Sequence, residues 1–425
     1  MAIEDDVLVI GGGLAGIAAA VGAHEQGARV RLVSHKQSTM RQASGLIDLL
    51  GYTPNGDGPV VDPFEAIEEL PEGHPYERAG LDAVRAAMDM FDDATGEMYA
   101  GSHTDKNALV PTHGGAIKPT ARYPDSAAPG IASAHGDTLF VGFDSMIEFD
   151  APVAADHLAA TGVPYETDGA TIEFPGNLRD DAKVTRFAHL LDRDDEVAVD
   201  GTTMPVRTAL AERVKEHIDG HDRVGFPAVL GDDNAAEVRA ELADKLGASV
   251  FEVPMGPPSL PGLRLEDRLY EYLHEIGVRV STGNPIVDVE QANGEIDRVV
   301  GDHTGREVPY KAQQYILATG GLVGKGIDSD REGVYEPVFD CHVPHPADRY
   351  DWFEDGAFDD HEFARFGVPV DTELRPLDAD NVPEFENLRA AGSVLGGYDF
   401  PSEKSGSGVS LATGYAAGEL AGDRV

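Results

Sequence analysis

Glycines recur at a fixed spacing near the start of the chain, at Gly11, Gly13 and Gly16. This G-x-G-x-x-G spacing suits a phosphate or pyrophosphate: Gly11 permits a tight turn, and Gly13 has no side chain to keep an anion from the backbone. Gly16 allows the following helix to pack closely on the preceding strand. A second glycine-rich segment, 392–397, lies near the other end of the chain.

The first glycine segment has the flanking elements that a nucleotide-binding turn requires. Val7 to Ile10 is a continuous apolar run, which predicts a buried parallel strand. A helix follows at 17–21, with its N-terminal N–H groups toward the anion, and a second strand is predicted at 28–33. Glycine segments that bracket nearly the whole chain are typical of flavin-dependent two-domain oxidoreductases.

The end of the second strand lacks a residue that dinucleotide folds usually carry. An Asp or Glu there holds a ribose 2′-OH, but this sequence reads Val33-Ser34-His35-Lys36. Either the adenosine end is held differently, or the cofactor has no adenosine, as in FMN. His35 and Lys36 are either phosphate contacts or ordinary surface residues.

The composition is strongly acidic, with 76 acidic and 33 basic residues and a formal net charge of −43. Such a surface stays hydrated in concentrated salt, where its self-repulsion is screened, so we expect a halophilic protein. A hydrophobic content of 41% argues against a disordered acidic chain. Nucleic acid is an unsuitable partner, because phosphate contacts need clustered Lys and Arg.

Cys341 is the only cysteine. A single cysteine excludes both an intrachain disulfide and a cysteine-ligated iron–sulfur cluster. A path of metal centres for electrons would therefore belong to another protein of a complex. The segment 341–345 has too few ligands for a structural zinc, and we predict no metal site. We expect its histidines to lie in a mobile loop, available for proton transfer. No signal peptide or membrane helix is visible, so any membrane association would come through a partner.

The predicted fold class is α/β, a Rossmann-like FAD/NAD(P)-binding flavoprotein fold with an inserted α/β domain. We expect the flavin-binding domain at 1–50, 280–330 and 366–425, the inserted domain at 51–279, and a loop or cap segment at 331–365. Further helices are predicted at 81–90, 206–218, 263–276 and 409–420, and further strands at 138–143, 224–230, 249–254, 278–280, 286–289, 296–300 and 315–318.

Six segments carry a family resemblance, at 9–16, 44–50, 257–265, 317–321, 366–376 and 392–399. On these segments nearly the whole chain resembles the B subunits of anaerobic glycerol-3-phosphate dehydrogenases, within the fumarate-reductase-like flavoproteins. The first and fourth segments are common to many flavoproteins. The segments 44–50, 366–376 and 392–399 are more specific.

The resemblance implies one component of an oxidoreductase that converts sn-glycerol 3-phosphate to dihydroxyacetone phosphate and passes electrons to quinone under anaerobic conditions. It implies bound FMN, with FAD as the alternative. It also implies two partners: the FAD-bearing dehydrogenase, which is the A subunit of the family complex, and the iron–sulfur, membrane-anchoring C subunit. The location would be cytoplasmic, at the inner face of the cell membrane through these partners. Two alternatives stay open: a free-standing FAD-dependent dehydrogenase of another small anionic substrate, and a non-catalytic assembly subunit.

The cofactor-binding candidates come from the glycine segments and from turns near predicted strand ends. Ser44 and Gly45 suit contact with the isoalloxazine ring, although Ser44 could instead cap a helix. The start of the helix predicted near Val409 would face the negative charge of a reduced flavin. The predicted set is Gly11, Gly13, Ala15, Gly16, Ser34, Ser44, Gly45, Gly320, Gly392, Gly397, Gly408 and Val409.

Three basic residues are the catalytic candidates. Arg375 either clamps a phosphate or carboxylate or pairs with Asp371, and the same alternatives hold for Arg264. Lys118 forms with Arg122 a small basic island in an acidic chain, which suggests an anion site.

Overall fold

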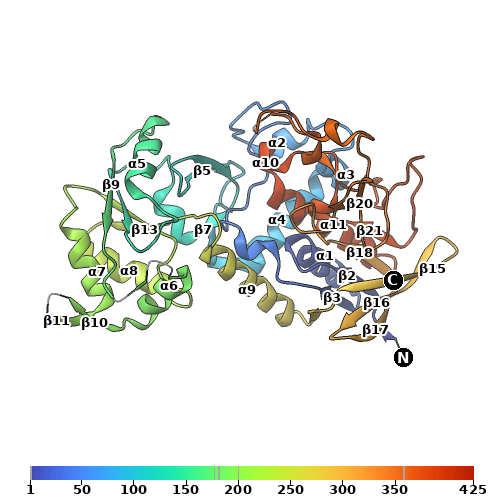
Figure 1. Ribbon diagram of the computed structural model, residues 1–425, viewed down its shortest axis with the longest axis horizontal. Helices are drawn as coiled ribbons and strands as arrows, with labels where there is room; N and C mark the ends of the chain where they lie inside the picture. The colour runs from blue at the N-terminus through green and yellow to red at the C-terminus, as the bar shows by residue number, and fades with distance from the viewer. Residues whose placement is uncertain (1, 177, 180–181, 200, 358) are drawn as a thin grey trace. The chain divides into compact units, whose positions relative to one another are not determined.

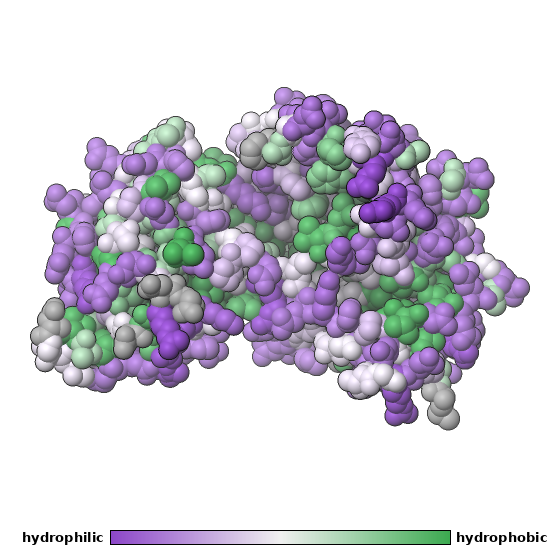
Figure 2. All heavy atoms as spheres, in the orientation of Figure 1, coloured by the Kyte–Doolittle hydropathy of each residue, from purple (hydrophilic) through white to green (hydrophobic). Residues whose placement is uncertain are grey.

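The computed structural model describes residues 2–176, 178–179, 182–199, 201–357 and 359–425 (Figure 1). The chain forms two compact units, which we describe separately. Unit 1 comprises Met1–Thr39, Asp48–Thr95 and Asp267–Val425, and unit 2 comprises Met40–Ile47 and Gly96–Glu266. The face seen in Figure 2 is mainly hydrophilic, as the acidic composition leads one to expect. No helix in the described ranges is long and apolar enough to cross a membrane.

A five-stranded parallel sheet forms the centre of unit 1, in the order β14–β3–β2–β18–β21. Its middle strand β2 is buried along its whole length, as a strand covered on both faces of a parallel sheet must be. Val9 of β2 pairs with Leu32 of β3 on one side and with Ile316 of β18 on the other. The strands are β2 (Val7–Ile10), β3 (Val30–Ser34), β14 (Arg279–Thr282), β18 (Gln314–Leu317) and β21 (Leu388–Ala390).

Helices α1 (Leu14–Glu25) and α11 (Gly406–Gly422) lie side by side in unit 1. Small residues allow this approach: a Cβ atom at Gly414 would collide with the Ala15 carbonyl oxygen, and one at Gly418 with that of Ala19. Helices α3 (Pro75–Ala79) and α4 (Leu81–Thr95) also contact α11. The two ends of the chain therefore share one core.

A second sheet of unit 1 has the order β1–β17–β16–β15. Its strands are β1 (Ile3–Glu4), β15 (Ile286–Ala292), β16 (Glu295–His303) and β17 (Arg306–Lys311). The smaller elements of this unit are α2 (Pro63–Ile67), β19 (Asp328–Ser329), β20 (Val334–Tyr335), η4 (Arg349–Trp352), η5 (Glu362–Arg365), η6 (Gly392–Val394) and α10 (Phe400–Glu403).

Unit 2 is built on a parallel sheet of order β13–β12–β8–β9, surrounded by helices α5 to α8. Phe174 packs between Phe143 and Phe187, with ring centroids 5.0 and 5.1 Å apart, in an apolar core. The main elements are β8 (Thr138–Phe143), α5 (Ala151–Ala160), β9 (Thr167–Ile172), α6 (Val184–Arg193), α7 (Val206–Lys215), β12 (Arg223–Pro227), α8 (Ala235–Leu246) and β13 (Ser249–Val253). The smaller ones are η2 (Gly96–Met98), η3 (Asp125–Gly130) and the paired strands β4 (Tyr99–Ala100) with β7 (Tyr123–Pro124), β5 (Ala108–Pro111) with β6 (Ile117–Thr120), and β10 (Glu196–Val199) with β11 (Thr202–Pro205). Helix η1 (Thr39–Gln42) and helix α9 (Leu260–Glu275) contain residues of both units.

The division into units differs from the boundaries predicted from the sequence. Residues 51–95 and 267–279, predicted in the inserted domain, belong to unit 1, and residues 40–47 belong to unit 2. For residues 51–95 the reason is that α3 and α4 pack on α11, far away in the sequence. The segment 331–365, predicted as a separate cap, is part of unit 1.

Candidate functional site

The first glycine segment forms a turn between β2 and α1. Gly11 has a φ of +127° and donates its amide to the Val33 carbonyl oxygen at 2.9 Å. A Cβ atom at Gly11 would collide with the Ala318 carbonyl, and one at Gly16 with the Gly11 carbonyl, so both glycines are required by packing. At Gly13, a Cβ atom would meet no described atom within 4 Å. The open side of the turn is therefore at Gly13, the start of α1, which suits an anion.

The second glycine segment meets the first at Ala15. Gly392 has a φ of +78°, and a Cβ atom there would stand 2.5 Å from the Ala15 Cβ. The Gly392 amide donates to Thr413 Oγ1 of α11 at 2.9 Å. The structure thus brings together the predicted residues at 11–16 and 392. Ala15 itself is buried and serves as a packing contact.

The end of β18 supplies a third side of this region. Gly320 has a φ of +90°, and the Gly321 amide donates to Ser393 Oγ at 3.0 Å. Thr319 Oγ1 is buried without a hydrogen-bond partner among the described residues. A buried hydroxyl without a partner beside an open glycine turn fits a polar ligand, and these residues therefore fit the phosphate-bearing chain of a flavin.

The position of the missing ribose carboxylate is occupied by a buried serine. Ser34 ends β3, and its carbonyl oxygen accepts the Asn284 amide at 3.0 Å. A Cβ atom at Gly12 would lie 2.9 Å from the Ser34 Cβ, so the two positions adjoin. The Tyr270 hydroxyl donates to the Gly12 carbonyl at 2.9 Å. Sequence reasoning missed Tyr270, because nothing local marks a contact between α9 and this turn.

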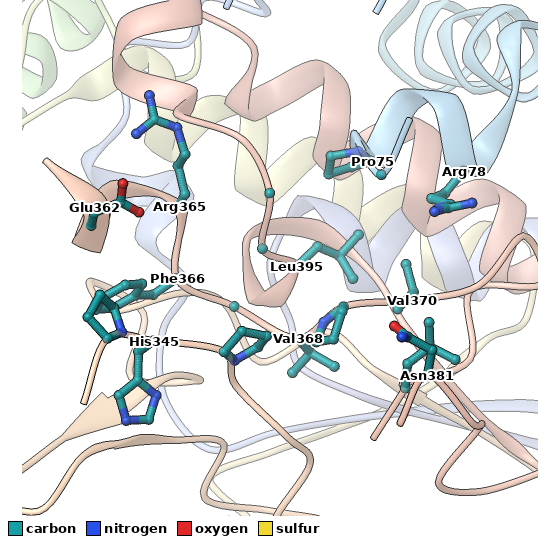
Figure 3. Close-up of a pocket in the computed structure, with 18 residues that line it drawn as sticks. Pro75, Arg78, His345, Glu362, Arg365, Phe366, Val368, Val370, Asn381 and Leu395 are labelled. Carbon is teal, nitrogen blue, oxygen red and sulfur yellow. The ribbon is translucent and has the colours of Figure 1, made fainter. Parts of the chain in front are cut away.

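A pocket of about 570 Å³ opens in unit 1 beside the end of the second glycine segment (Figure 3). Gly397, a predicted cofactor residue, lines it together with Arg78 and Arg365. In Figure 3 these two arginines lie on either side of Leu395. Gly397 has a φ of +86°, and a Cβ atom there would lie 3.2 Å from the Gly73 carbonyl. The pocket wall is largely apolar and carries the carboxylate of Glu362 as well as the two guanidinium groups, which suits a flat heterocyclic ligand with polar edges.

His345 also lines the pocket, but it is not a free proton-transfer group. Its Nδ1 lies 2.7 Å from the Val343 carbonyl oxygen, and its Nε2 accepts the Val334 amide at 3.3 Å. Both ring nitrogens therefore bond to the backbone. The expectation that this histidine is available for proton transfer is wrong, since its contacts hold the 334 and 343 backbones together.

Helix α11 begins at Gly406 and packs its first turn against Asp48. The Gly408 amide donates to the Asp48 carbonyl at 2.8 Å, and Ser407 Oγ donates to the Asp48 carboxylate at 2.8 Å. A Cβ atom at Gly408 would collide with the Tyr76 hydroxyl, whose pKa is raised by burial and by the nearby Asp48. Val409 is fully buried. Gly408 and Val409 therefore have packing roles, and their flavin contact stays a prediction.

Ser44 and Gly45 belong to unit 2. Ser44 Oγ accepts the Leu46 amide at 3.5 Å, and the next helix begins only at Pro63, so Ser44 caps no helix. Gly45 has a φ of +79°, and its carbonyl accepts the Tyr99 hydroxyl at 2.7 Å. Burial raises the Tyr99 pKa, which keeps this phenol a donor. Tyr99 is a second residue that sequence reasoning missed.

The arginine candidates are held by carboxylates. Arg375 Nε donates to Asp371 at 2.9 Å, and its Nη1 donates to Glu386 at 2.6 Å. Arg264, in unit 2, pairs with the buried Glu252 at 2.7 Å. These contacts favour the structural alternative for both residues, and a catalytic role for either stays a prediction.

Lys118 lies in β6 of unit 2. Its predicted companion Arg122 is buried and donates Nη1 to the Gly101 carbonyl at 3.2 Å. The two residues do not form an exposed basic island, because the Arg122 guanidinium binds backbone carbonyls inside the unit.

Comparison with known proteins places this geometry in context. A family described as an FAD binding domain matches residues 6–409. A Halobacterium salinarum protein, named as the probable B subunit of an anaerobic glycerol-3-phosphate dehydrogenase, is 61% identical over 425 residues, which cover 100% of this chain and 99% of that protein.

A bacterial relative and a solved structure are more distant. The B subunit of the anaerobic glycerol-3-phosphate dehydrogenase of Pectobacterium atrosepticum is 32% identical over 426 residues, with 97% of each chain covered. The crystal structure of 3-ketosteroid delta1-dehydrogenase from Sterolibacterium denitrificans is 11% identical, with 99% of this chain and 100% of that chain covered and a TM-score of 0.45.

Proposed function

The chain belongs to the FAD-binding-domain proteins and to the family of anaerobic glycerol-3-phosphate dehydrogenase B subunits, and from this premise we propose that it is the flavin-binding subunit of a glycerol-3-phosphate:quinone oxidoreductase. The single observation that carries the proposal is the convergence of the two glycine segments on Ala15. Their convergence next to the open Gly13 turn makes a flavin cradle from opposite ends of the chain.

We propose FAD as the flavin, because the matching family is an FAD-binding domain over nearly the whole chain. In this assignment Gly13 and the first N–H groups of α1 hold phosphate, and Thr319 Oγ1 gains the partner that it lacks among the described residues. The expectation of FMN rests on the family resemblance and on the absence of a carboxylate near Ser34, and FMN is the alternative outcome of the test.

The reaction proposed is oxidation of sn-glycerol 3-phosphate, with electrons passing to quinone through other subunits. A bound flavin supplies the chemistry, since it accepts two electrons and releases them singly. An onward path through iron–sulfur clusters requires a partner, because Cys341 is the only thiol of this chain and is buried. The partners proposed are the family's FAD-bearing A subunit and its iron–sulfur C subunit, which would hold the complex at the inner face of the membrane.

The pocket beside Gly397 is the proposed place where the reacting end of the flavin and a small anion meet. Arg78 and Arg365 are the guanidinium groups there, although Arg78 also pairs with Glu77 at 3.4 Å and Arg365 with Asp360 at 2.5 Å, and the apolar wall limits access of water. His345 forms part of the pocket wall and does not transfer protons, because both of its ring nitrogens are hydrogen-bonded to the backbone.

Flavin release tests this function. The chain is purified in concentrated KCl and denatured, and the chromophore is separated by chromatography. About one FAD per chain is expected, whereas FMN near one per chain keeps the electron-relay role but changes the cofactor. A folded chain without flavin overturns the proposal in favour of an assembly role. Turnover of glycerol 3-phosphate with a soluble dye by the isolated chain would instead favour a free-standing dehydrogenase.

A further inference from the structure

The segment 348–365 of unit 1 exposes aromatic side chains that the proposed function does not use. The exposed fractions are 75% for Tyr350, 49% for Phe353 and 40% for Phe363. Aromatic residues make up only 7% of the chain, so three exposed ones in one short segment are a local concentration. Exposed aromatic side chains of this kind are the residues that most often anchor protein interfaces.

These side chains stand on a fixed base. Trp352, the only tryptophan of the chain, donates its Nε1 to the Pro346 carbonyl at 2.8 Å. Its ring centroid lies 5.8 Å from those of both His345 and Phe366, in edge-on contacts. The short helices η4 and η5 also contact each other. The exposed Phe353 therefore directly follows a residue that is held in place, which lowers the entropy cost of binding.

The charge of the segment defines the chemistry of a partner. It contains seven carboxylates and only two basic residues, Arg349 and Arg365, a net charge of −5 in 18 residues. The whole chain carries −43 in 425 residues, so the charge density here is well above the mean. Exposed aromatic side chains interspersed in sequence with carboxylates fit a protein surface that presents both apolar contacts and Lys or Arg.

The segment also reaches the pocket. Glu362 and Arg365 line the pocket, as does Phe366 directly after the segment, and Figure 3 shows Phe366 next to His345 with Glu362 and Arg365 on its other side. A protein bound to the segment would therefore lie next to the pocket in which the flavin is proposed to react. Proximity of this kind is what electron exchange between two proteins requires.

We propose that segment 348–365 is the docking surface for a protein partner with a basic rim that exchanges electrons with the bound flavin. The proposal rests on the proposed function, because it takes the chain to be one component of an electron-transferring complex. Tyr350, Phe353 and Phe363 form the apolar centre of the contact, and the surrounding carboxylates guide the approach of the basic partner.

The test uses the full chain co-expressed with the A and C subunits in a halophilic host. Tyr350→Ser, Phe353→Ser and Phe363→Ser are combined in one variant. The matched control combines Val61→Ser, Val287→Ser and Val323→Ser, three exposed apolar residues of unit 1 outside the segment. The dissociation constants of the A and C subunits are measured on each immobilised variant. The flavin content and the unfolding temperature of each variant are measured as well. The aromatic variant is expected to bind at least tenfold more weakly, with the control unchanged.

A second variant keeps the proposal testable if the aromatic variant does not fold. Asp351→Asn, Glu354→Gln and Asp355→Asn remove exposed charges and no packing, and a several-fold slower association is expected at the lowest KCl that keeps the chain folded. Wild-type affinity in both variants overturns the docking surface while leaving the flavin function intact. Wild-type chain that holds flavin but binds neither partner overturns the complex and the surface together. The proposal is also overturned if the aromatic variant loses binding to lipid vesicles but binds the partner subunits as the natural chain does.

Discussion

Gly392 stands against Ala15 so closely that a Cβ atom on it would lie 2.5 Å from the Ala15 Cβ. The Gly392 φ of +78° and its hydrogen bond to Thr413 hold the backbone in this position. The second glycine segment is therefore locked onto the helix that follows the first one. The cradle proposed for the flavin depends on a backbone contact that only glycine permits at 392.

Gly392→Ala is expected to lower the free energy of unfolding by about 2–4 kcal/mol, because it adds both backbone strain and a steric clash. Denaturant unfolding at constant KCl measures the change. Gly27→Ala is the matched control, since Gly27 has a φ of +89° but no described atom within 4 Å of an added Cβ. It should lose only about 1 kcal/mol. Equal losses in the two variants would show that the contact with Ala15 contributes nothing.

Gly13→Ala separates binding from folding. Gly13 has a φ of −83° and open space around it, so an added methyl group should change the free energy of unfolding by less than about 0.5 kcal/mol. The methyl group would occupy the approach of the phosphate, and at least tenfold weaker flavin retention is expected. Flavin absorbance per chain after dialysis measures retention.

Gly16→Ala is the contrasting variant. Its Cβ atom would collide with the Gly11 carbonyl, so the fold itself should be damaged and flavin lost with it. If Gly13→Ala retained flavin as the natural chain does, the glycine turn would not be the phosphate site.

Some elements of the fold follow from short patterns in the sequence. The strand Val7–Ile10, the glycine turn and the helix predicted at 17–21 follow from an apolar run and glycine spacing. The structure confirms them, with α1 extending from Leu14 to Glu25. The strand predicted at 138–143 has the same bounds as β8. Helix α4 was also predicted, but not its packing on α11, because an amphipathic helix does not encode which partner covers its apolar face.

The contacts that join distant segments could not be predicted. Tyr270 on Gly12 and Tyr99 on Gly45 are single hydrogen bonds from helix or strand residues with no motif around them. His345 looked available for chemistry because a sequence shows residue types but not hydrogen-bond partners. The glycine spacing marked candidate sites, whereas the groups that fix those sites depend on the tertiary fold.

Arg375→Gln tests whether this arginine is structural. It would leave Asp371 and Glu386 without their shared cation, whereas Glu373 keeps its pair with Arg424. A loss of about 1–2 kcal/mol in the free energy of unfolding is expected at low KCl, less at high KCl. Flavin content and substrate-dependent flavin reduction in the assembled complex should stay at natural levels. Arg298→Gln, which breaks an exposed pair with Glu290, is the control and should leave the unfolding curve unchanged. A loss of flavin reduction without a loss of stability would restore the catalytic role.

The buried pair of Glu252 and Arg264 should govern part of the acid stability of unit 2. Burial alone would raise the pKa of Glu252, but the charge and hydrogen bonds of Arg264 and the Leu230 amide outweigh it and hold the pKa below its ordinary value of 4.5. A carboxyl with a lower pKa in the folded chain stabilises the fold above its unfolded pKa. That contribution is lost as the pH falls through the folded pKa.

Glu252→Gln should therefore destabilise the chain by about 3–5 kcal/mol at pH 7, because it leaves a buried guanidinium unpaired. As the pH falls below about 4.5, the natural chain loses the contribution of its carboxylate, and the difference between the two proteins should shrink. Urea unfolding from pH 7 to pH 3 at constant KCl measures both curves. Asp195→Asn is the control: Asp195 forms an exposed pair with Arg193 that solvent screens, so its curve should stay close to that of the natural chain across the pH range. A difference between Glu252→Gln and the natural chain that stays constant down to pH 3 would mean that the pKa of Glu252 is the same in the folded and unfolded chains, and that Arg264 does not lower it.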